Sequence, residues 1–201
     1  MNKTILLGGS GFLGPVILSK DPGIISIGRS PIDSSLKNKH LNLDSLDKLD
    51  VLDEIDFNNV IFLIGSSNHH EINKKITMGI DYNVYPLQKI LKYLSKRKLN
   101  KFICFTSMLL YDQKKIVNPV NENQVINPYT NDYIFSKFLS EEIVRFYENK
   151  VPSIIVRLSN IYGYTKLIRP DLVPTLMQNV LNKDDITVWS DKPKRDFIFT
   201  E

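Results

Sequence analysis

The sequence predicts an α/β fold built on a doubly wound parallel sheet, and two observations carry this prediction. Five short apolar runs show no polar alternation, which is typical of strands covered on both faces; they are Thr4–Leu7, Ile24–Ile27, Val60–Ile64, Phe102–Phe105 and Ser153–Leu158. Segments of helical character separate them: Leu13–Lys20, Leu46–Leu52, Val84–Lys98 and Asp132–Asn149. Because strand and helix alternate, right-handed crossovers give a parallel sheet with helices on both faces.

Turn-forming residues fall where this fold needs them. Asp21-Pro22-Gly23 precedes the second strand, and Pro152 precedes the last long apolar run. The stretch 118–130, with its prolines and asparagines, is predicted to be a loop that leads into the helix beginning near residue 132. Asn131 or Asp132 is expected to cap that helix.

Composition narrows the class of protein. The 201 residues, of which 42% are hydrophobic, suffice for one domain or one domain with a small lobe, and no apolar run approaches a membrane span. The net charge is +4, but basic and acidic residues alternate, so no nucleic-acid partner is expected. The single cysteine, Cys104, is expected in the core. It permits no internal disulfide and favours a cytoplasmic location, and no metal site is expected.

A glycine-rich turn follows the first predicted strand, with glycines at positions 8, 11 and 14. In a Rossmann-type fold the first glycine permits a tight turn, the second lets backbone N–H groups approach a pyrophosphate, and the third allows close helix–strand packing. The phosphates then lie at the helix N-terminus. The spacing alone is also compatible with a plain tight turn, but the flanking strand and helix favour NAD(P), with Gly8, Gly11, Phe12, Leu13 and Gly14 as cofactor-binding residues.

The second predicted strand ends in Gly28-Arg29-Ser30, where dinucleotide-binding domains usually place an acid that contacts the ribose 2′-hydroxyl. A guanidinium and a hydroxyl at this position suit a 2′-phosphate, so Arg29 favours NADP over NAD. The alternatives are that Arg29 stacks on the adenine or faces solvent.

Three residues form a candidate catalytic set. Tyr133 and Lys137 are four positions apart and therefore share one face of the predicted helix. Ser107 ends a predicted strand at the carboxyl edge of the sheet, where ligands bind in open α/β folds. A tyrosine has a reference pKa near 10 and needs a positive charge nearby to act as a base. Lys137 supplies that charge and can also bind the nicotinamide ribose, while Ser107 holds the substrate oxygen.

A tyrosine and a lysine at this spacing can also be an ordinary amphipathic pair on a helix surface. The glycine turn and the serine at a strand end favour the catalytic interpretation, because one function then explains all three features. His69 and His70 follow the fourth predicted strand and could act as acid or base. Histidines in such positions are more often surface residues, so they are not included in the predicted site.

The chain resembles the extended short-chain dehydrogenase/reductase family, in its nucleotide-sugar epimerase/dehydratase branch. The resemblance rests on 8–14, Asp44, Asn83-Val84, Thr106-Ser107 with Leu110-Tyr111, Tyr133 with Ser136-Lys137, 157–163 and 195–198. It implies that Asp44 contacts the adenine, that Asn83 supports the active-site backbone, and that Asn160 and Arg195 bind the diphosphate of a nucleotide-sugar substrate. It further implies a homodimer formed by packing the helices Val84–Lys98 and Asp132–Asn149 of two subunits.

Departures from this family refine the expected reaction. Met108-Leu109 stand where dehydratases carry an Asp-Glu pair, so dehydration is disfavoured. Tyr111-Asp112 replaces the usual Tyr-Gly, with no clear consequence. Family members continue for about a hundred residues beyond the segment that resembles 195–198, about the size of a small domain, so an incomplete C-terminal substrate lobe is expected.

The expected organisation is therefore an NAD(P)-binding Rossmann domain over residues 1–162 and a partial substrate-binding lobe over 163–201. The expected function is an NAD(P)-dependent nucleotide-sugar epimerase or keto-sugar reductase acting by hydride transfer with the Ser-Tyr-Lys set. The alternative is a non-catalytic NAD(P)-binding sensor or scaffold.

Overall fold

The computed structural model describes residues 3–163, 171–187, 190 and 194–200. The chain divides into two compact units, Met1–Leu158 and Ser159–Glu201, which are described separately. In the part of the chain that is described, no helix is long and apolar enough to cross a membrane.

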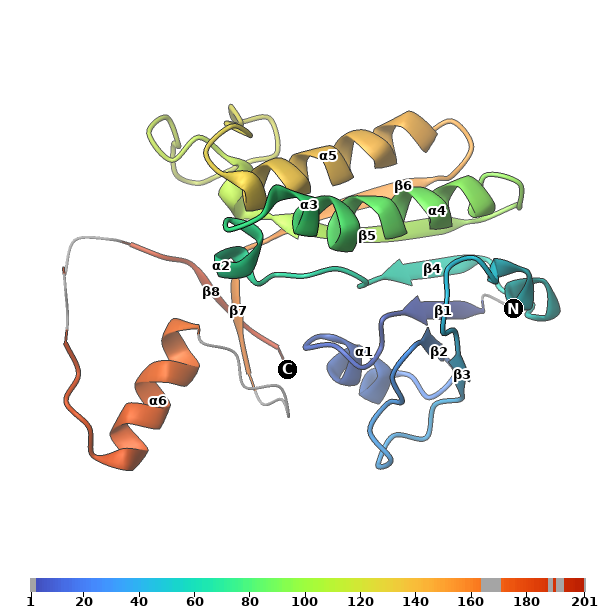
Figure 1. Ribbon diagram of the computed structural model, residues 1–201, viewed down its shortest axis with the longest axis horizontal. Coiled ribbons are helices and arrows are strands. Elements are labelled where there is room, and N and C mark those ends of the chain that lie inside the picture. The colour runs from blue at the N-terminus through green and yellow to red at the C-terminus, as the bar shows by residue number, and fades with distance from the viewer. Residues whose placement is uncertain (1–2, 164–170, 188–189, 191–193, 201) are drawn as a thin grey trace. The chain divides into compact units, whose positions relative to one another are not determined.

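The first unit contains a six-stranded parallel sheet in the order β3-β2-β1-β4-β5-β6 (Figure 1). This is the strand order of a doubly wound dinucleotide-binding fold, so the predicted fold class is confirmed. The strands are β1 (Thr4–Leu7), β2 (Ile25–Gly28), β3 (His40–Asn42), β4 (Asn59–Phe62), β5 (Lys101–Ser107) and β6 (Ser153–Leu158). The predicted strands at 4–7 and 153–158 occupy the predicted residues.

Helical segments connect the strands. They are α1 (Gly14–Lys20), η1 (Leu49–Glu54), α2 (His69–Ile72), α3 (Ile76–Gly79), η2 (Ile80–Val84), α4 (Tyr85–Leu94), η3 (Met108–Leu110) and α5 (Asp132–Tyr147). Figure 1 shows α4 and α5 side by side along the same face of the sheet. The cap predicted for α5 is confirmed for Asn131, whose side chain accepts a hydrogen bond from the Ile134 N–H at 2.9 Å.

The core has a separate apolar cluster on each face of the sheet. Ile5 and Leu7 pack on one face with α4, η1 and Val144 of α5, whereas Leu6 packs on the other face with Leu18 of α1. Successive residues of β1 therefore point to opposite faces, and both are buried. Burial of both faces explains why the apolar runs show no polar alternation. The prediction that Cys104 lies in the core is also confirmed, since its exposed fraction is 2%.

Most expected elements differ from the structure by one or a few residues at their ends, and two helices differ most. The helix expected at 46–52 is a 3₁₀ helix, Leu49–Glu54, which buries Leu49 and Leu52 together because residues three apart are aligned in 3₁₀ geometry. The helix expected from Val84 begins at Tyr85 and ends at Leu94. Pro86 fits its first turn because helix N-terminal N–H groups need no intrahelical acceptor.

The second unit contains a two-stranded parallel sheet of β7 (Asn160–Tyr162) and β8 (Phe197–Phe199), together with the helix α6 (Leu172–Asn182). The Tyr162 ring packs against Phe197 and Phe199, with ring centroids 6.2 and 5.3 Å apart. These contacts hold together segments that are far apart in the sequence.

Candidate functional site

The glycine turn joins β1 to α1 at the carboxyl edge of the sheet. The Gly8 N–H donates to the Ile27 carbonyl at 3.0 Å, and the Gly11 N–H donates to the Gly8 carbonyl at 3.2 Å. Gly8 has a φ of 91°, a backbone conformation that side chains with a Cβ rarely adopt. The turn therefore requires glycine at position 8, as the sequence predicts for the first glycine.

Close backbone packing fixes a second position of the turn. A Cβ on Gly14 would lie 2.1 Å from the Gly9 carbonyl oxygen, so the start of α1 can approach the turn only without a side chain. At Gly11 a Cβ would meet only the Gly8 carbonyl oxygen, at the ordinary contact distance of 3.4 Å. The contacts of the described residues therefore do not require glycine at position 11.

Arg29 and Asp44 lie at the same edge of the sheet as the glycine turn. Arg29 is exposed directly after β2, and Asp44 is exposed two residues after β3. The Leu43 N–H donates to the Gly28 carbonyl at 3.1 Å, which ties the end of β3 to the end of β2. Asn42 donates to the Asp44 carboxylate at 2.8 Å. Arg29 and Asp44, the two predicted cofactor-contacting side chains, thus follow the ends of the neighbouring strands β2 and β3.

Ser107 is the last residue of β5 and is buried. Its side-chain oxygen accepts a hydrogen bond from the Leu109 N–H at 3.2 Å and so caps the short helix η3. A hydroxyl that accepts one hydrogen bond keeps its own proton for donation. Ser107 can therefore serve as a structural cap and still donate to a substrate oxygen.

Tyr133 and Lys137 meet on the first turns of α5. The Lys137 ammonium lies 5.6 Å from the centre of the Tyr133 ring, and Tyr133 is buried. Burial lowers the pKa of Lys137 to about 8. The Tyr133 ring belongs to an apolar cluster with Leu110 and the partly buried Leu109, both in the segment that follows Ser107. The structure thus brings α5 and the end of β5 together.

Asn83 links the segment after β4 to α5. It is buried in η2, a π-helical turn, and its side-chain carbonyl accepts from the Ser66 N–H at 2.7 Å. Its amide donates to the Ser136 hydroxyl at 3.0 Å, which in turn donates to the Tyr133 carbonyl at 2.8 Å. These bonds give Asn83 the kind of backbone-supporting contact that the family resemblance implies. They also tie the connection between β4 and β5 to the helix that carries Tyr133.

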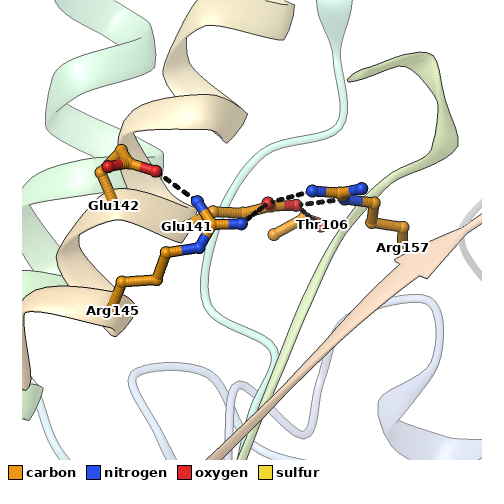
Figure 2. Close-up of polar contacts among 5 residues, drawn as sticks. All are labelled: Thr106, Glu141, Glu142, Arg145 and Arg157. Carbon is orange, nitrogen blue, oxygen red and sulfur yellow. Dashed lines mark hydrogen bonds and ion pairs between the residues drawn. The ribbon is translucent and has the colours of Figure 1, made fainter. Parts of the chain in front are cut away.

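A network of charged side chains surrounds the buried Glu141 of α5 (Figure 2). Arg157 of β6 makes two hydrogen bonds to the fully buried Glu141 of α5, at 2.9 and 2.7 Å, and Thr106 of β5 donates to Glu141 at 2.8 Å. Burial by itself disfavours the charged carboxylate, but the hydrogen bonds and the Arg157 charge outweigh it and lower the pKa of Glu141. The network fastens α5, which carries Tyr133 and Lys137, to β6 and to β5, which ends at Ser107.

The two predicted substrate-binding residues lie in the second unit. Asn160 begins β7, and its side chain donates to the Asp196 carbonyl at 3.1 Å. Arg195 is exposed just before β8. Pairing of β7 with β8 brings the segments that carry these two residues together within the second unit.

Sequence reasoning missed two sets of polar contacts made by α5, one at Glu141 and one at the backbone of Tyr133. Glu141 and Arg157 are separated along the chain, and only a charged residue at a buried helix position could have indicated the pair. Asn73, which contacts the backbone of Tyr133, lies in the irregular connection after β4, where no periodicity points to it. In the described residues no cluster of His, Cys, Asp and Glu could hold a metal ion.

Fold and site together define a Rossmann-type α/β protein with a glycine turn and a tyrosine–lysine pair at the carboxyl edge of one sheet. The chain belongs to the NAD dependent epimerase/dehydratase family, whose model matches residues 4–201, and it is an enzyme of that family. The predicted resemblance is thereby confirmed. No curated protein sequence matches the chain.

Several solved structures share this fold at low sequence identity. A UDP-N-acetylglucosamine 4-epimerase from Methanobrevibacter ruminantium, in complex with UDP-N-acetylmuramic acid, superposes with a TM-score of 0.83 at 16% identity, covering 99% of this chain and 69% of that chain. A UDP-glucose 4-epimerase from Thermotoga maritima, with UDP-glucose, gives 0.83 at 18% identity, covering 100% and 70%. The Bordetella bronchiseptica enzyme WbmH, in complex with NAD⁺, gives 0.80 at 19% identity, covering 100% and 68%.

Proposed function

We propose that the protein is an NAD(P)-dependent nucleotide-sugar epimerase or keto-sugar reductase that works by hydride transfer with Ser107, Tyr133 and Lys137. The observation that carries the proposal is the position of the Lys137 ammonium, 5.6 Å from the Tyr133 ring, on the helix that packs against the end of β5. Membership of an NAD-dependent enzyme family supports it. The solved neighbours in complex with UDP-sugars support the nucleotide-sugar class of substrate.

The glycine turn fits a dinucleotide. Gly8 and Gly14 bring the chain into a tight turn at the start of α1, where backbone N–H groups have no intrahelical acceptor, and Gly11 leaves that turn open to a close ligand. Phe12 and Leu13 supply the N–H groups between the last two glycines. In the proposed complex these residues hold the pyrophosphate, while Asp44 lies beside the adenine. When bound, the nicotinamide supplies a hydride acceptor and donor.

The side chains divide the proton chemistry between them. Oxidation of a sugar carbinol to a ketone removes a hydride from carbon and a proton from oxygen, and Tyr133 takes that proton. The Lys137 charge favours the phenolate, and Lys137 also holds the nicotinamide ribose. The Ser107 hydroxyl donates to the substrate oxygen and keeps it in place. Return of the hydride to either face of the ketone regenerates an alcohol, so epimerisation needs no further acid or base.

Two neighbouring residues disfavour elimination of water. Met108 and Leu109 follow Ser107 in η3, where a dehydratase needs a carboxylate to remove a proton from carbon. Neither side chain can accept a proton. Epimerisation and ketone reduction therefore remain, and both use the same three residues.

Arg29 carries the proposed preference for NADP. Its exposed guanidinium stands at the end of β2, where a planar fork of donors can make paired hydrogen bonds to a 2′-phosphate. Asn160 and Arg195 are proposed to bind the substrate diphosphate. In the second unit Asn160 begins β7, and Arg195 lies two residues before β8. The proposed domain boundary remains after residue 162, and the proposed location is the cytoplasm.

The decisive experiment combines binding and turnover. The purified full chain is titrated with NAD and with NADP and then incubated with UDP-glucose, UDP-N-acetylglucosamine and UDP-glucuronic acid. Epimer or reduced product is expected, with activity at least about a thousandfold lower in Tyr133→Phe and cofactor binding nearly unchanged. Undiminished turnover in Tyr133→Phe contradicts the mechanism. Cofactor binding without product from any sugar supports the sensor alternative, and tenfold tighter binding of NAD than of NADP contradicts the role of Arg29.

A further inference from the structure

Asn73 contacts Tyr133 through a hydrogen bond that spans much of the chain. The Tyr133 N–H is one of the first donors of α5, which have no acceptor within the helix. Asn131 caps the following residue, Ile134, and leaves the Tyr133 donor to the Asn73 side chain, which accepts it at 2.9 Å across 60 residues of sequence. The backbone of the proposed catalytic base is therefore fixed by a residue outside its own helix.

His69 contacts the side chain of the same tyrosine. Its ring lies edge-on to the Tyr133 ring, with centroids 5.9 Å apart and an interplanar angle of 60°. This arrangement places the positive edge of one ring against the negative face of the other and is favourable. Backbone and ring of Tyr133 are thus both contacted from α2 and the residue that follows it.

The α2 segment is itself held firmly against α5. Ile72 is completely buried in the apolar cluster that contains Tyr133 and Ile134. Asn73 is the C-cap residue of α2, and its N–H donates to the His69 carbonyl at 2.9 Å, which fixes the spacing between the two contacting residues. A displacement of either residue would consequently be transmitted to Tyr133.

We propose that Asn73 and His69 are positioning residues for Tyr133: Asn73 fixes its backbone, and His69 supports its ring as an aromatic partner that exchanges no proton. This inference rests on the proposed function of Tyr133 as the base. Two side chains with separate contacts thus hold the Tyr133 ring in its position near Lys137. The functional consequence is orientation, because a base displaced by about 1 Å can lose about a hundredfold in rate.

Substitution of Asn73 tests the backbone contact. In Asn73→Ala, kcat with the UDP-sugar that the wild type turns over should fall by about tenfold to a hundredfold, while KM changes little. The acidic limb of the kcat pH profile should move to higher pH, because a displaced phenol gains less from the Lys137 charge. Asn73→Asp keeps the accepting oxygen and should restore both kcat and the pH profile. Wild-type kcat in Asn73→Ala, or equal losses in both variants, would overturn the inference.

Substitution of His69 separates ring support from acid–base chemistry. His69→Phe keeps an aromatic edge without a titratable nitrogen and should retain most of the activity, whereas His69→Ala should lose about tenfold. The neighbouring His70→Ala is the matched control and should behave as the wild type. If His69→Phe is as impaired as His69→Ala, the histidine acts through its nitrogens and the proposed role is wrong.

A measurement without turnover keeps this inference separate from the proposed function. Hydrogen exchange of the Tyr133 amide in the full chain should be faster in Asn73→Ala than in the wild type and in Asn73→Asp, because the variant removes its acceptor. If the wild type turns over no sugar, the proposed function fails, and the exchange rates still decide whether Asn73 holds Tyr133. Equal exchange in all three proteins overturns the placement.

Discussion

Lys137 shows how burial alters a single residue at the site. The residue is partly buried, and burial of its ammonium group lowers the pKa of Lys137 to about 8. Near neutral pH it is therefore still charged, as the proposed support of a phenolate requires. At higher pH it becomes a neutral amine. Burial of Lys137 thus limits its positive charge to pH values below about 8.

This lowered pKa predicts a change of stability with pH. The unfolded chain keeps Lys137 protonated up to its ordinary pKa of 10.5, so between about 8 and 10.5 the unfolded state binds more protons and stability rises with pH. Lys137→Met removes the titrating group, so the variant lacks this increase of stability with pH. The free energy of unfolding of the wild type, relative to that of Lys137→Met, should therefore increase by on the order of 2 kcal/mol from about pH 7 to about pH 9.5.

Urea unfolding of the two proteins across this range measures the effect, and Lys74→Met is the control. Lys74 is an exposed lysine whose ammonium pairs with Glu71, so Lys74→Met removes a lysine charge at the surface and leaves Lys137 in place. A difference between wild type and Lys137→Met that stays constant with pH would show that Lys137 is not desolvated in the folded protein.

Among single residues, the sequence predicted those contacts that are made between residues close together in the chain. Tyr133 and Lys137 are four positions apart on one helix, and helix geometry alone brings them together. The contact between Asn73 and Tyr133 depends on how two crossover connections pack, for which local sequence contains no pattern. The second role of Ser107, as the cap of η3, likewise becomes visible only with the backbone in place.

At the scale of elements, the network around Glu141 joins α5 to β5 and β6 (Figure 2). Arg157 and Arg145 both bind Glu141, but the Arg157 side chain is 14% exposed and that of Arg145 is 41% exposed. A charge pair is strong where both partners are desolvated and weak where water screens one of them. Arg157 is therefore the partner on which the buried carboxylate depends.

This contrast predicts unequal losses of stability. Arg157→Met leaves a buried carboxylate without its main partner and should lower the free energy of unfolding by about 3 kcal/mol or more, whereas Arg145→Met should cost less than about 1 kcal/mol. Because the Glu141 pKa is lowered, its stabilising effect is present above the ordinary value of 4.5 and is lost as the pH falls below it. Denaturant unfolding at neutral pH gives the comparison.

A double variant separates the ion pair from general damage. Glu141→Leu combined with Arg157→Met removes both charges and should recover much of the stability lost in Arg157→Met, because no unpaired charge remains buried. Equal losses in Arg145→Met and Arg157→Met, or a double variant no more stable than Arg157→Met, would contradict the account.

Elements were predictable where burial imposes a pattern. β1 and β6 are runs of apolar residues, and both occupy the predicted residues. β3 was missed because His40 and Asn42 flank a single leucine, and such a short polar edge strand has no recognisable period. The connection after β4 was missed as well, since α2, α3 and the π-helical η2 are too short to show helical periodicity.

At the scale of the whole molecule, α4 and α5 carry aromatic residues that are largely exposed. Tyr85 of α4 is 50% exposed and Phe146 of α5 is 79% exposed. The two helices lie side by side on one face of the sheet (Figure 1), so two subunits can pack them into a four-helix bundle. Exposed aromatic rings are enriched in such interfaces. This surface therefore supports the proposed homodimer.

The dimer predicts a selective response to charge on α5. Wild-type protein should sediment as a dimer at micromolar concentration, and Phe146→Glu should shift it toward the monomer, because the substitution places an unpaired charge in an apolar interface. Leu181→Glu is the matched control, since Leu181 of α6 is also 79% exposed and lies outside these helices. A wild type that sediments only as a monomer would contradict the dimer. A monomer produced by Leu181→Glu and not by Phe146→Glu would show that the interface does not lie on α4 and α5.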